Sequence, residues 1–253
     1  MKYTQGIYPV VSVNKLNETT YDFVIKAPDI AKKAKEGQFV QVKADGFFLR
    51  RPISLGGITE DTIRIIFEVK GDGTKAIANI KEGDMIDVMG PLGHGFTVSD
   101  QKKVILIGGG IGTPPMLPLA EDFKENATVI LGFRSKEQVI LKEDFEKTGA
   151  KVIICTNDGS MGEKGFVTDV LKTLIDEKPD MIYSCGPNVM LKAVATMANE
   201  NDIPCEVSLE ERMACGVGAC LGCACKTKSH DGTSSHAHVC KNGPVFDSKE
   251  VIF

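Results

Sequence analysis

The sequence predicts a multidomain β plus α/β protein: an antiparallel β-barrel, a doubly wound parallel α/β domain and a small loop domain. Three observations support this prediction. Short strand-like runs separated by glycine turns fill the first part, strand-like and helix-like runs alternate in the second, and five of the eight cysteines gather in the third. We therefore expect domains at residues 1–99, 100–206 and 207–253.

The overall composition excludes several classes of protein. The 253 residues are 42% hydrophobic, which suffices for a substantial core. A net charge of −4 argues against a nucleic-acid-binding surface. The longest apolar run, residues 104–120, is interrupted by four glycines and three prolines and does not suit a membrane span. The first residues lack the pattern of a signal peptide, so eight cysteines indicate the reducing cytoplasm, with no membrane partner.

The first part reads as short strands separated by turns at glycines, which is typical of a small antiparallel barrel. We expect strands over residues 7–16, 20–26, 39–43, 62–70 and 85–89. Within this part Arg51, Pro52, Ile53 and Ser54 form a segment that can present a cation to a phosphate and a hydroxyl to a flavin ring. Taken alone, the segment is more commonly a surface arginine before a strand.

A second segment of the first part ends a strand in glycines and begins a helix. Phe67 and Glu68 lead into Gly71, Gly73 and Thr74. The amide groups at such a helix start can bind a pyrophosphate. An ordinary hairpin turn with a threonine cap explains the same residues.

The second part begins with a buried strand, residues 104–107, that runs directly into a glycine turn and a helix start. This order indicates a nucleotide-binding unit, although the glycine spacing differs from the G-x-G-x-x-G fingerprint. Further strands are expected at 128–133, 151–156 and 181–184, with helices at 142–147, 167–177 and 189–201. The alternation predicts a doubly wound parallel sheet.

Ligands of such sheets bind beyond the carboxyl ends of the strands. The glycine turn at 108–112 and the segment Cys185, Gly186 and Pro187 both lie at such ends, so we expect them to form one crevice. Cys185 alone would more often be a buried structural thiol. We assign it a positioning role, because hydride transfer to a flavin requires no protein nucleophile.

The third part contains the most specific pattern in the chain. Cys215, Cys220 and Cys223 are spaced C-x4-C-x2-C, and Cys240 follows after sixteen residues. This is the plant-type ferredoxin arrangement, so we expect the four thiolates to hold a [2Fe-2S] cluster. Zinc is the alternative, because C-x2-C is also half of a zinc site. Cys225 could compete as a ligand, but we expect a strand residue that points away.

The chain resembles the ferredoxin-reductase superfamily through the segments at 51–54, 73–74, 108–114 and 185–187. With the cysteine pattern and the preceding Glu210 and Met213, it looks like the electron-transfer subunits of NAD-dependent, type B dihydroorotate dehydrogenases. The resemblance implies FAD on Arg51, Pro52, Ile53, Ser54, Ile66, Phe67, Glu68, Gly73 and Thr74. It implies NAD on Gly109, Gly110, Gly112, Thr113, Cys185, Gly186 and Pro187.

The same resemblance implies a function in electron transfer. NAD(H) would exchange electrons, through FAD and a [2Fe-2S] cluster, with the FMN of a separate catalytic subunit that oxidises dihydroorotate to orotate in pyrimidine biosynthesis. Two chains of each kind would form a heterotetramer. The small subunits of ferredoxin:NADP oxidoreductases and sulfide dehydrogenases share this architecture, but they typically carry aspartate where this chain has Cys215. A zinc-stiffened nucleotide-binding regulator is the alternative from another class.

Overall fold

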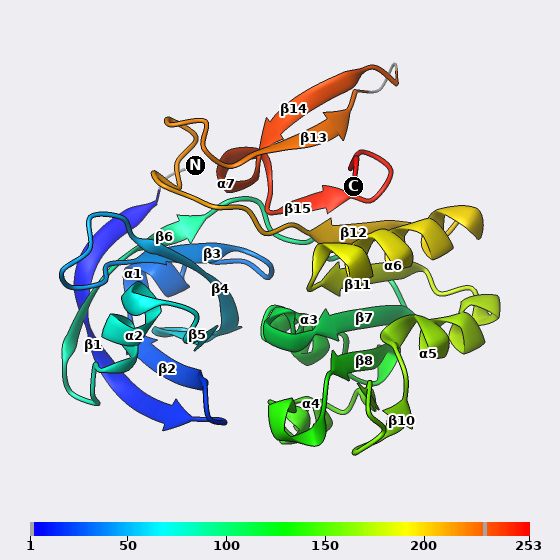
Figure 1. Ribbon diagram of the computed structural model, residues 1–253, viewed down its shortest axis with the longest axis horizontal. Helices are drawn as coiled ribbons and strands as arrows, with labels where there is room; N and C mark the ends of the chain where they lie inside the picture. Colours follow the sequence, from blue (N-terminus) through cyan, green and yellow to red (C-terminus); the bar gives the residue numbers. More distant parts are fainter. Residues whose placement is uncertain (1–2, 230–231) are drawn as a thin grey trace.

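The computed structural model describes residues 3–229 and 232–253. The N-terminal part forms a closed antiparallel barrel in the strand order β1-β2-β5-β4-β3-β6, as predicted (Figure 1). Its strands are β1 (Thr4–Lys15), β2 (Thr20–Lys26), β3 (Phe39–Val42), β4 (Arg51–Ile58), β5 (Thr62–Glu68) and β6 (Met85–Leu92). Two short helices, α1 (Pro28–Ala31) and α2 (Asp72–Ala78), accompany them.

The two faces of β3 have different neighbours. Val40 and Val42 point into the barrel and belong to its core. Phe39 belongs instead to the large core that the C-terminal part of the chain shares. Because successive side chains of a strand point to opposite faces, Gln41 lies on the same outer face as Phe39. This strand therefore connects the barrel to the C-terminal segment.

The second part contributes most of a seven-stranded sheet in the order β10-β9-β8-β7-β11-β12-β15. Its strands are β7 (Val104–Gly109), β8 (Ala127–Phe133), β9 (Lys151–Thr156), β10 (Glu163–Lys164), β11 (Met181–Cys185), β12 (Cys205–Ser208) and β15 (Val245–Asp247). All neighbours are parallel except β12 and β15. The chain builds outward from β7 and then returns to place β11 on its other side, which is the doubly wound topology predicted from the sequence.

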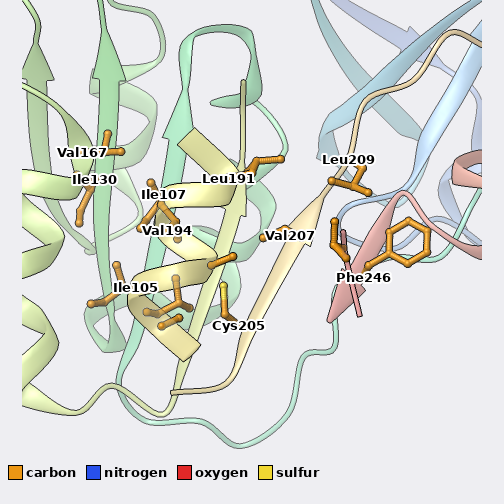
Figure 2. Packing of buried hydrophobic residues seen from close by; sticks show 14 of the residues in the cluster. Ile105, Ile107, Ile130, Val167, Leu191, Val194, Cys205, Val207, Leu209 and Phe246 are labelled. Atoms are coloured by element: carbon orange, nitrogen blue, oxygen red, sulfur yellow. The ribbon is translucent and has the colours of Figure 1, made fainter. Parts of the chain in front are cut away.

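Helices cover both faces of this sheet. They are α3 (Met116–Phe123), α4 (Lys142–Lys147), α5 (Val167–Leu174) and α6 (Asn188–Glu200), with 3-10 turns η1 (Gly110–Gly112), η2 (Lys124–Asn126), η3 (Lys136–Gln138) and η4 (Ile175–Glu177). Leu106 of β7 packs in the core with residues of α3 and α4. Ile105 and Ile107 face α5 and α6, where Leu191 and Val194 lie (Figure 2). Burial on both faces explains the uninterrupted apolar run of β7.

The C-terminal segment lies across both larger parts (Figure 1). It forms the hairpin of β13 (Ala224–Lys228) and β14 (Ser234–His238), then α7 (Val239–Asn242), and ends with β15 at the sheet edge. Phe246 of β15 packs near Leu209, which extends the sheet core into the C-terminal segment (Figure 2). The cysteine-rich segment is therefore anchored to the α/β sheet.

An ion-pair cluster joins the barrel to the α/β part. Arg64 of β5 binds both carboxylate oxygens of Asp22, at 3.0 and 2.9 Å, and reaches Asp144 of α4 at 3.2 Å. The Asp22 side chain is 4% exposed. The ion pair between Arg64 and Asp144 links β5 of the barrel to α4, and α4 lies on the side of the molecule away from the C-terminal hairpin (Figure 1). Among the described residues, no helix is long and apolar enough to cross a membrane.

Candidate functional site

The glycine turn after β7 packs directly on the end of β11. Gly110 has φ +53°, in the left-handed region that favours glycine. A Cβ on Gly112 would collide with the carbonyl group of Cys185 and with Gly186. A Cβ on Gly109 would meet Met190 and Pro187. The two predicted NAD segments thus come together between β7 and β11, where the strand order reverses.

Cys185 is buried at the end of β11. Burial raises the pKa of its thiol to about 12, although a hydrogen bond with the Ser208 side chain acts in the opposite direction. The sulfur is therefore protonated at neutral pH and is a poor nucleophile. This argues against a covalent role for Cys185.

Two buried hydroxyl groups lie at the same end of the sheet. Thr113 Oγ1 follows the glycine turn, and Ser184 Oγ lies on β11. Within the described chain neither has a hydrogen-bond partner. Both side chains are 0% exposed, so they lie beneath the glycine turn and do not themselves face a ligand.

A pocket of about 790 Å³ lies where the barrel, the α/β part and the C-terminal segment meet. This is within the range of cofactor pockets. The barrel contributes Phe47, Phe48, Leu49, Arg50, Arg51, Pro52 and Thr74; the α/β part contributes Gly186, Pro187 and Asn188; the C-terminal segment contributes Glu210, Glu211, Arg212 and Met213. Predicted flavin residues and predicted nicotinamide residues therefore share one pocket.

Arg51 and Gly73 lie in contact beside this pocket. A Cβ on Gly73 would overlap the guanidinium group of Arg51, whose Cζ lies 5.0 Å from the ring centroid of Phe47. Thr74 Oγ1 accepts N–H groups of Lys70 and Gly71 at 3.0 and 3.2 Å, which closes the first turn of α2. The hydroxyl thus shapes the turn, and the cation is held where an anionic cofactor would need it.

Other predicted flavin residues do not line the pocket: Ile53, Ser54, Ile66, Phe67 and Glu68. The Ile53 and Phe67 side chains belong to the barrel core, where Phe67 meets Phe23 edge-on. Glu68 lies 3.6 Å from Lys70. Contact between Ile53 or Phe67 and a cofactor would therefore use the strand backbone.

Sequence reasoning did not assign several residues of this pocket. Arg50 Nη2 lies 2.7 Å from Asp87, so its charge is already paired. Asn188 begins α6, and Arg212 lies in the loop before the cysteines. A search for polar and charged residues that flank the predicted motifs would have found them.

The cysteine loop surrounds the sulfur of Cys215 with backbone N–H groups. Val217, Ala219 and Cys220 donate to this sulfur at 3.4, 3.3 and 3.4 Å. Burial alone would raise the pKa of Cys215, but these N–H groups and the Cys220 thiol lower it to about 6. Gly216 and Gly218 have φ +71° and +80°, which lets the loop turn these amides inward.

The other two predicted ligands, Cys223 and Cys240, form a second pair. The Cys240 N–H donates to Cys223 Sγ at 3.4 Å, and the Gly218 N–H donates to Cys240 Sγ at 3.1 Å. Burial and a side-chain hydrogen bond with Cys223 raise the pKa of Cys240 to about 12. Among the described residues, no three metal-binding side chains lie close enough together to hold one metal ion. Two thiol pairs, with amides directed at sulfur, fit a two-iron cluster.

Cys225 lies outside this arrangement of donors. It is half-buried on β13, opposite Ala237 of β14. Burial raises the pKa of its thiol. We keep Cys225 as a bystander.

The fold and these two sites define an iron-sulfur flavoprotein oxidoreductase that uses a pyridine nucleotide. Residues 106–196 match the model of the oxidoreductase NAD-binding domain, and residues 210–252 match the iron-sulfur cluster binding domain of dihydroorotate dehydrogenase B. The chain belongs to the family of dihydroorotate dehydrogenase B (NAD(+)) electron transfer subunits.

Relatives support this assignment over nearly the whole chain. The electron transfer subunit of Caldanaerobacter subterraneus is 43% identical over 88% of this chain and 89% of its own. That of Fusobacterium nucleatum is 43% identical over 94% of each. A solved NADH-dependent reduced ferredoxin-NADP oxidoreductase, from work on flavin-based electron bifurcation, is 31% identical with a TM-score of 0.87, covering 98% of this chain and 90% of that one.

Proposed function

We propose that this chain transfers electrons between NAD(H) and a separate FMN-containing subunit that oxidises dihydroorotate to orotate. The observation that carries the proposal is the pocket shared by all three parts of the chain. Its wall includes Arg51, the nicotinamide-side Pro187, and Met213 of the cysteine segment. A flavin held there would lie between the NAD site and the cluster.

The chain supplies binding and orientation. Arg51 neutralises the pyrophosphate, the turn at Gly109–Gly112 admits the nucleotide, and the four cysteines hold the iron. When bound, FAD exchanges a hydride with the nicotinamide and single electrons with the [2Fe-2S] cluster. The buried, protonated Cys185 helps to place the nicotinamide and takes no covalent part.

The partner subunit performs the chemistry on dihydroorotate. The shared pocket is one flavin site, and we assign no acid or base in it to abstract a carbon-bound proton. Cys220 is exposed, so the cluster loop can face another protein. We propose a heterotetramer of two chains of each kind that works in the cytoplasm.

Reconstitution tests this division of work. The purified chain should show flavin and iron-sulfur absorption and should oxidise NADH with an artificial acceptor, but it should not oxidise dihydroorotate. Adding the FMN subunit should restore dihydroorotate oxidation with NAD. Cys220→Ser should abolish the coupled reaction and spare flavin reduction by NADH. Dihydroorotate turnover by the chain alone, or a colourless zinc protein, would refute the proposal.

A further inference from the structure

Gln41 is the most unusual buried polar side chain of the barrel. It is 0% exposed, and neither Nε2 nor Oε1 has a hydrogen-bond partner among the described residues. Its backbone carbonyl accepts a hydrogen bond from Arg50 Nη1 at 3.3 Å, so only the side chain is unsatisfied. Leaving a buried amide unpaired is costly, and such groups in proteins almost always have a partner.

The Gln41 side chain is directed at the cysteine loop. A Cβ on Gly216 would lie 2.7 Å from Nε2 and 2.8 Å from Cγ of Gln41. Gly216 directly follows Cys215, whose sulfur already accepts three backbone N–H groups. The amide therefore lies against the peptide that carries the first predicted ligand.

The surroundings of Gln41 offer it few protein partners. Its outer-face neighbour Phe39 packs in one core with Met89, Cys223 and Cys240. The polar neighbour that the contacts give Gln41 is the cysteine loop at Gly216, and a cluster bound by this loop would bring sulfur acceptors to it.

Resting on the proposed function, we propose that the Gln41 amide donates a hydrogen bond to the sulfur of the bound [2Fe-2S] cluster or of its Cys215 ligand. An N–H group directed at cluster sulfur stabilises the added negative charge of the reduced form. Gln41 therefore raises the reduction potential of the cluster.

The position of Gln41 also relates the cluster to the flavin pocket. In the barrel sheet Gln41 pairs with Pro52, and Pro52 and its neighbour Arg51 line the pocket. In this pair, Gln41 contacts the cysteine loop and Pro52 lines the flavin pocket, so a single residue pair connects the two sites. Gln41, a barrel residue far from the cysteines in sequence, thus adjusts the reduction potential of the cluster that exchanges electrons with the flavin.

The test is the reduction potential of the cluster in Gln41→Met, a variant of similar size that lacks the amide. Losing this bond should change the reduction equilibrium roughly tenfold, a shift of about 59 mV to more negative potential for one electron. Gln38→Met is the matched control, because Gln38 is also buried but its amide is satisfied by Gly93 and Lys35. The control should lose stability and keep its potential.

A direct measurement covers the case in which Gln41→Met binds no cluster. Pulsed electron paramagnetic resonance of the reduced wild-type chain, labelled with ¹⁵N in glutamine side chains, should show a nitrogen coupled to the cluster. The coupling should vanish in Gln41→Glu. Absence of the coupling in the wild type, or an unchanged potential in an iron-loaded Gln41→Met, would overturn the inference. Failure of the wild type to bind iron would instead refute the proposed function.

Discussion

The guanidinium group of Arg51 occupies the space that a side chain on Gly73 would need. Arg51 begins β4 and Gly73 lies in the first turn of α2, so the barrel brings together two segments that sequence patterns had singled out separately. The absence of a Cβ at Gly73 leaves room for the arginine beside the helix start. The cation and the amides can then act on the same anion.

Arg51→Ala should weaken FAD binding because it removes a charge-assisted bond. We expect a loss of about 1.5 to 3 kcal/mol, or roughly 10- to 150-fold in Kd. Gly73→Ala should have a similar effect with little loss of stability, because the methyl group displaces only the flexible end of Arg51. Flavin titration followed by fluorescence measures both.

Gly71→Ala is the control for these variants. A Cβ on Gly71 meets nothing within 4 Å, and the backbone there is extended, so alanine fits. Its flavin affinity should equal that of the wild type. Unchanged affinity in both Arg51→Ala and Gly73→Ala would show that the pyrophosphate binds elsewhere.

Serine at Cys215, Cys220, Cys223 or Cys240 should reduce iron content and bleach the cluster spectrum, because each removes one of the paired donors. Cys225→Ser should leave both unchanged. Iron analysis and visible absorption distinguish the variants. Loss of iron in Cys225→Ser, with retention in Cys215→Ser, would mean that the ligand set is shifted.

The sequence predicted those elements whose signal is local. The uninterrupted apolar run of β7 reports burial on both faces, and the predicted helix at 189–201 is α6 shifted by one residue. The strand β15 has only three residues, and its partner β12 lies far away in sequence. No periodicity develops over three residues, so this strand and its place in the sheet could not be read from the sequence.

Gln41 shows the same limit at the site. A glutamine between two valines reads as the solvent-facing residue of a half-buried strand. The C-terminal segment covers that outer face, so the polar position is fully buried. The pocket is likewise formed by residues from all three parts of the chain. The sequence showed the separate motifs, but it did not show that they meet in one pocket.

Arg64→Leu should strongly destabilise the chain. It leaves the nearly buried Asp22 carboxylate without its two hydrogen bonds, which we expect to cost about 3 to 5 kcal/mol. Asp144→Asn removes only the outer ion pair, at a side chain that is 36% exposed, and should cost about 1 kcal/mol or less. Urea unfolding compares them; equal effects would contradict this explanation.

Cys205 should make stability sensitive to alkaline pH. Burial raises the pKa of its thiol to about 12, against an opposing hydrogen bond with Ser248. The folded chain therefore keeps a proton that the unfolded chain loses above about pH 8.5. The resulting stability is complete below that pH and falls by about 1.4 kcal/mol per unit as pH rises toward 12.

Cys205→Ala should remove this contribution to the dependence of the unfolding free energy on pH. The unfolding free energies of the wild type and the variant, measured at pH 8 and pH 10, give the comparison. The wild type should lose more stability than the variant over this interval. Equal losses of unfolding free energy in the wild type and the variant would show that Cys205 does not titrate with a raised pKa.

Gly112→Ala should impair the NAD site and spare the flavin. The added methyl group would collide with the backbone of Cys185 and Gly186, which cannot move aside as a flexible side chain can. The glycine turn must then shift away from β11, and we expect the KM for NADH to rise about tenfold or more, equivalent to about 1.4 kcal/mol. Gly149→Asn is the comparison, because a Cβ there meets nothing within 4 Å, asparagine tolerates its positive φ of +89°, and Gly149 lies before the amino end of β9, away from the glycine turn. Flavin reduction by NADH in a stopped-flow experiment should be weakened by the first variant and nearly unchanged in the second, with equal flavin content in both. Wild-type NADH affinity in Gly112→Ala would exclude the contact between this turn and β11 as part of the nucleotide site.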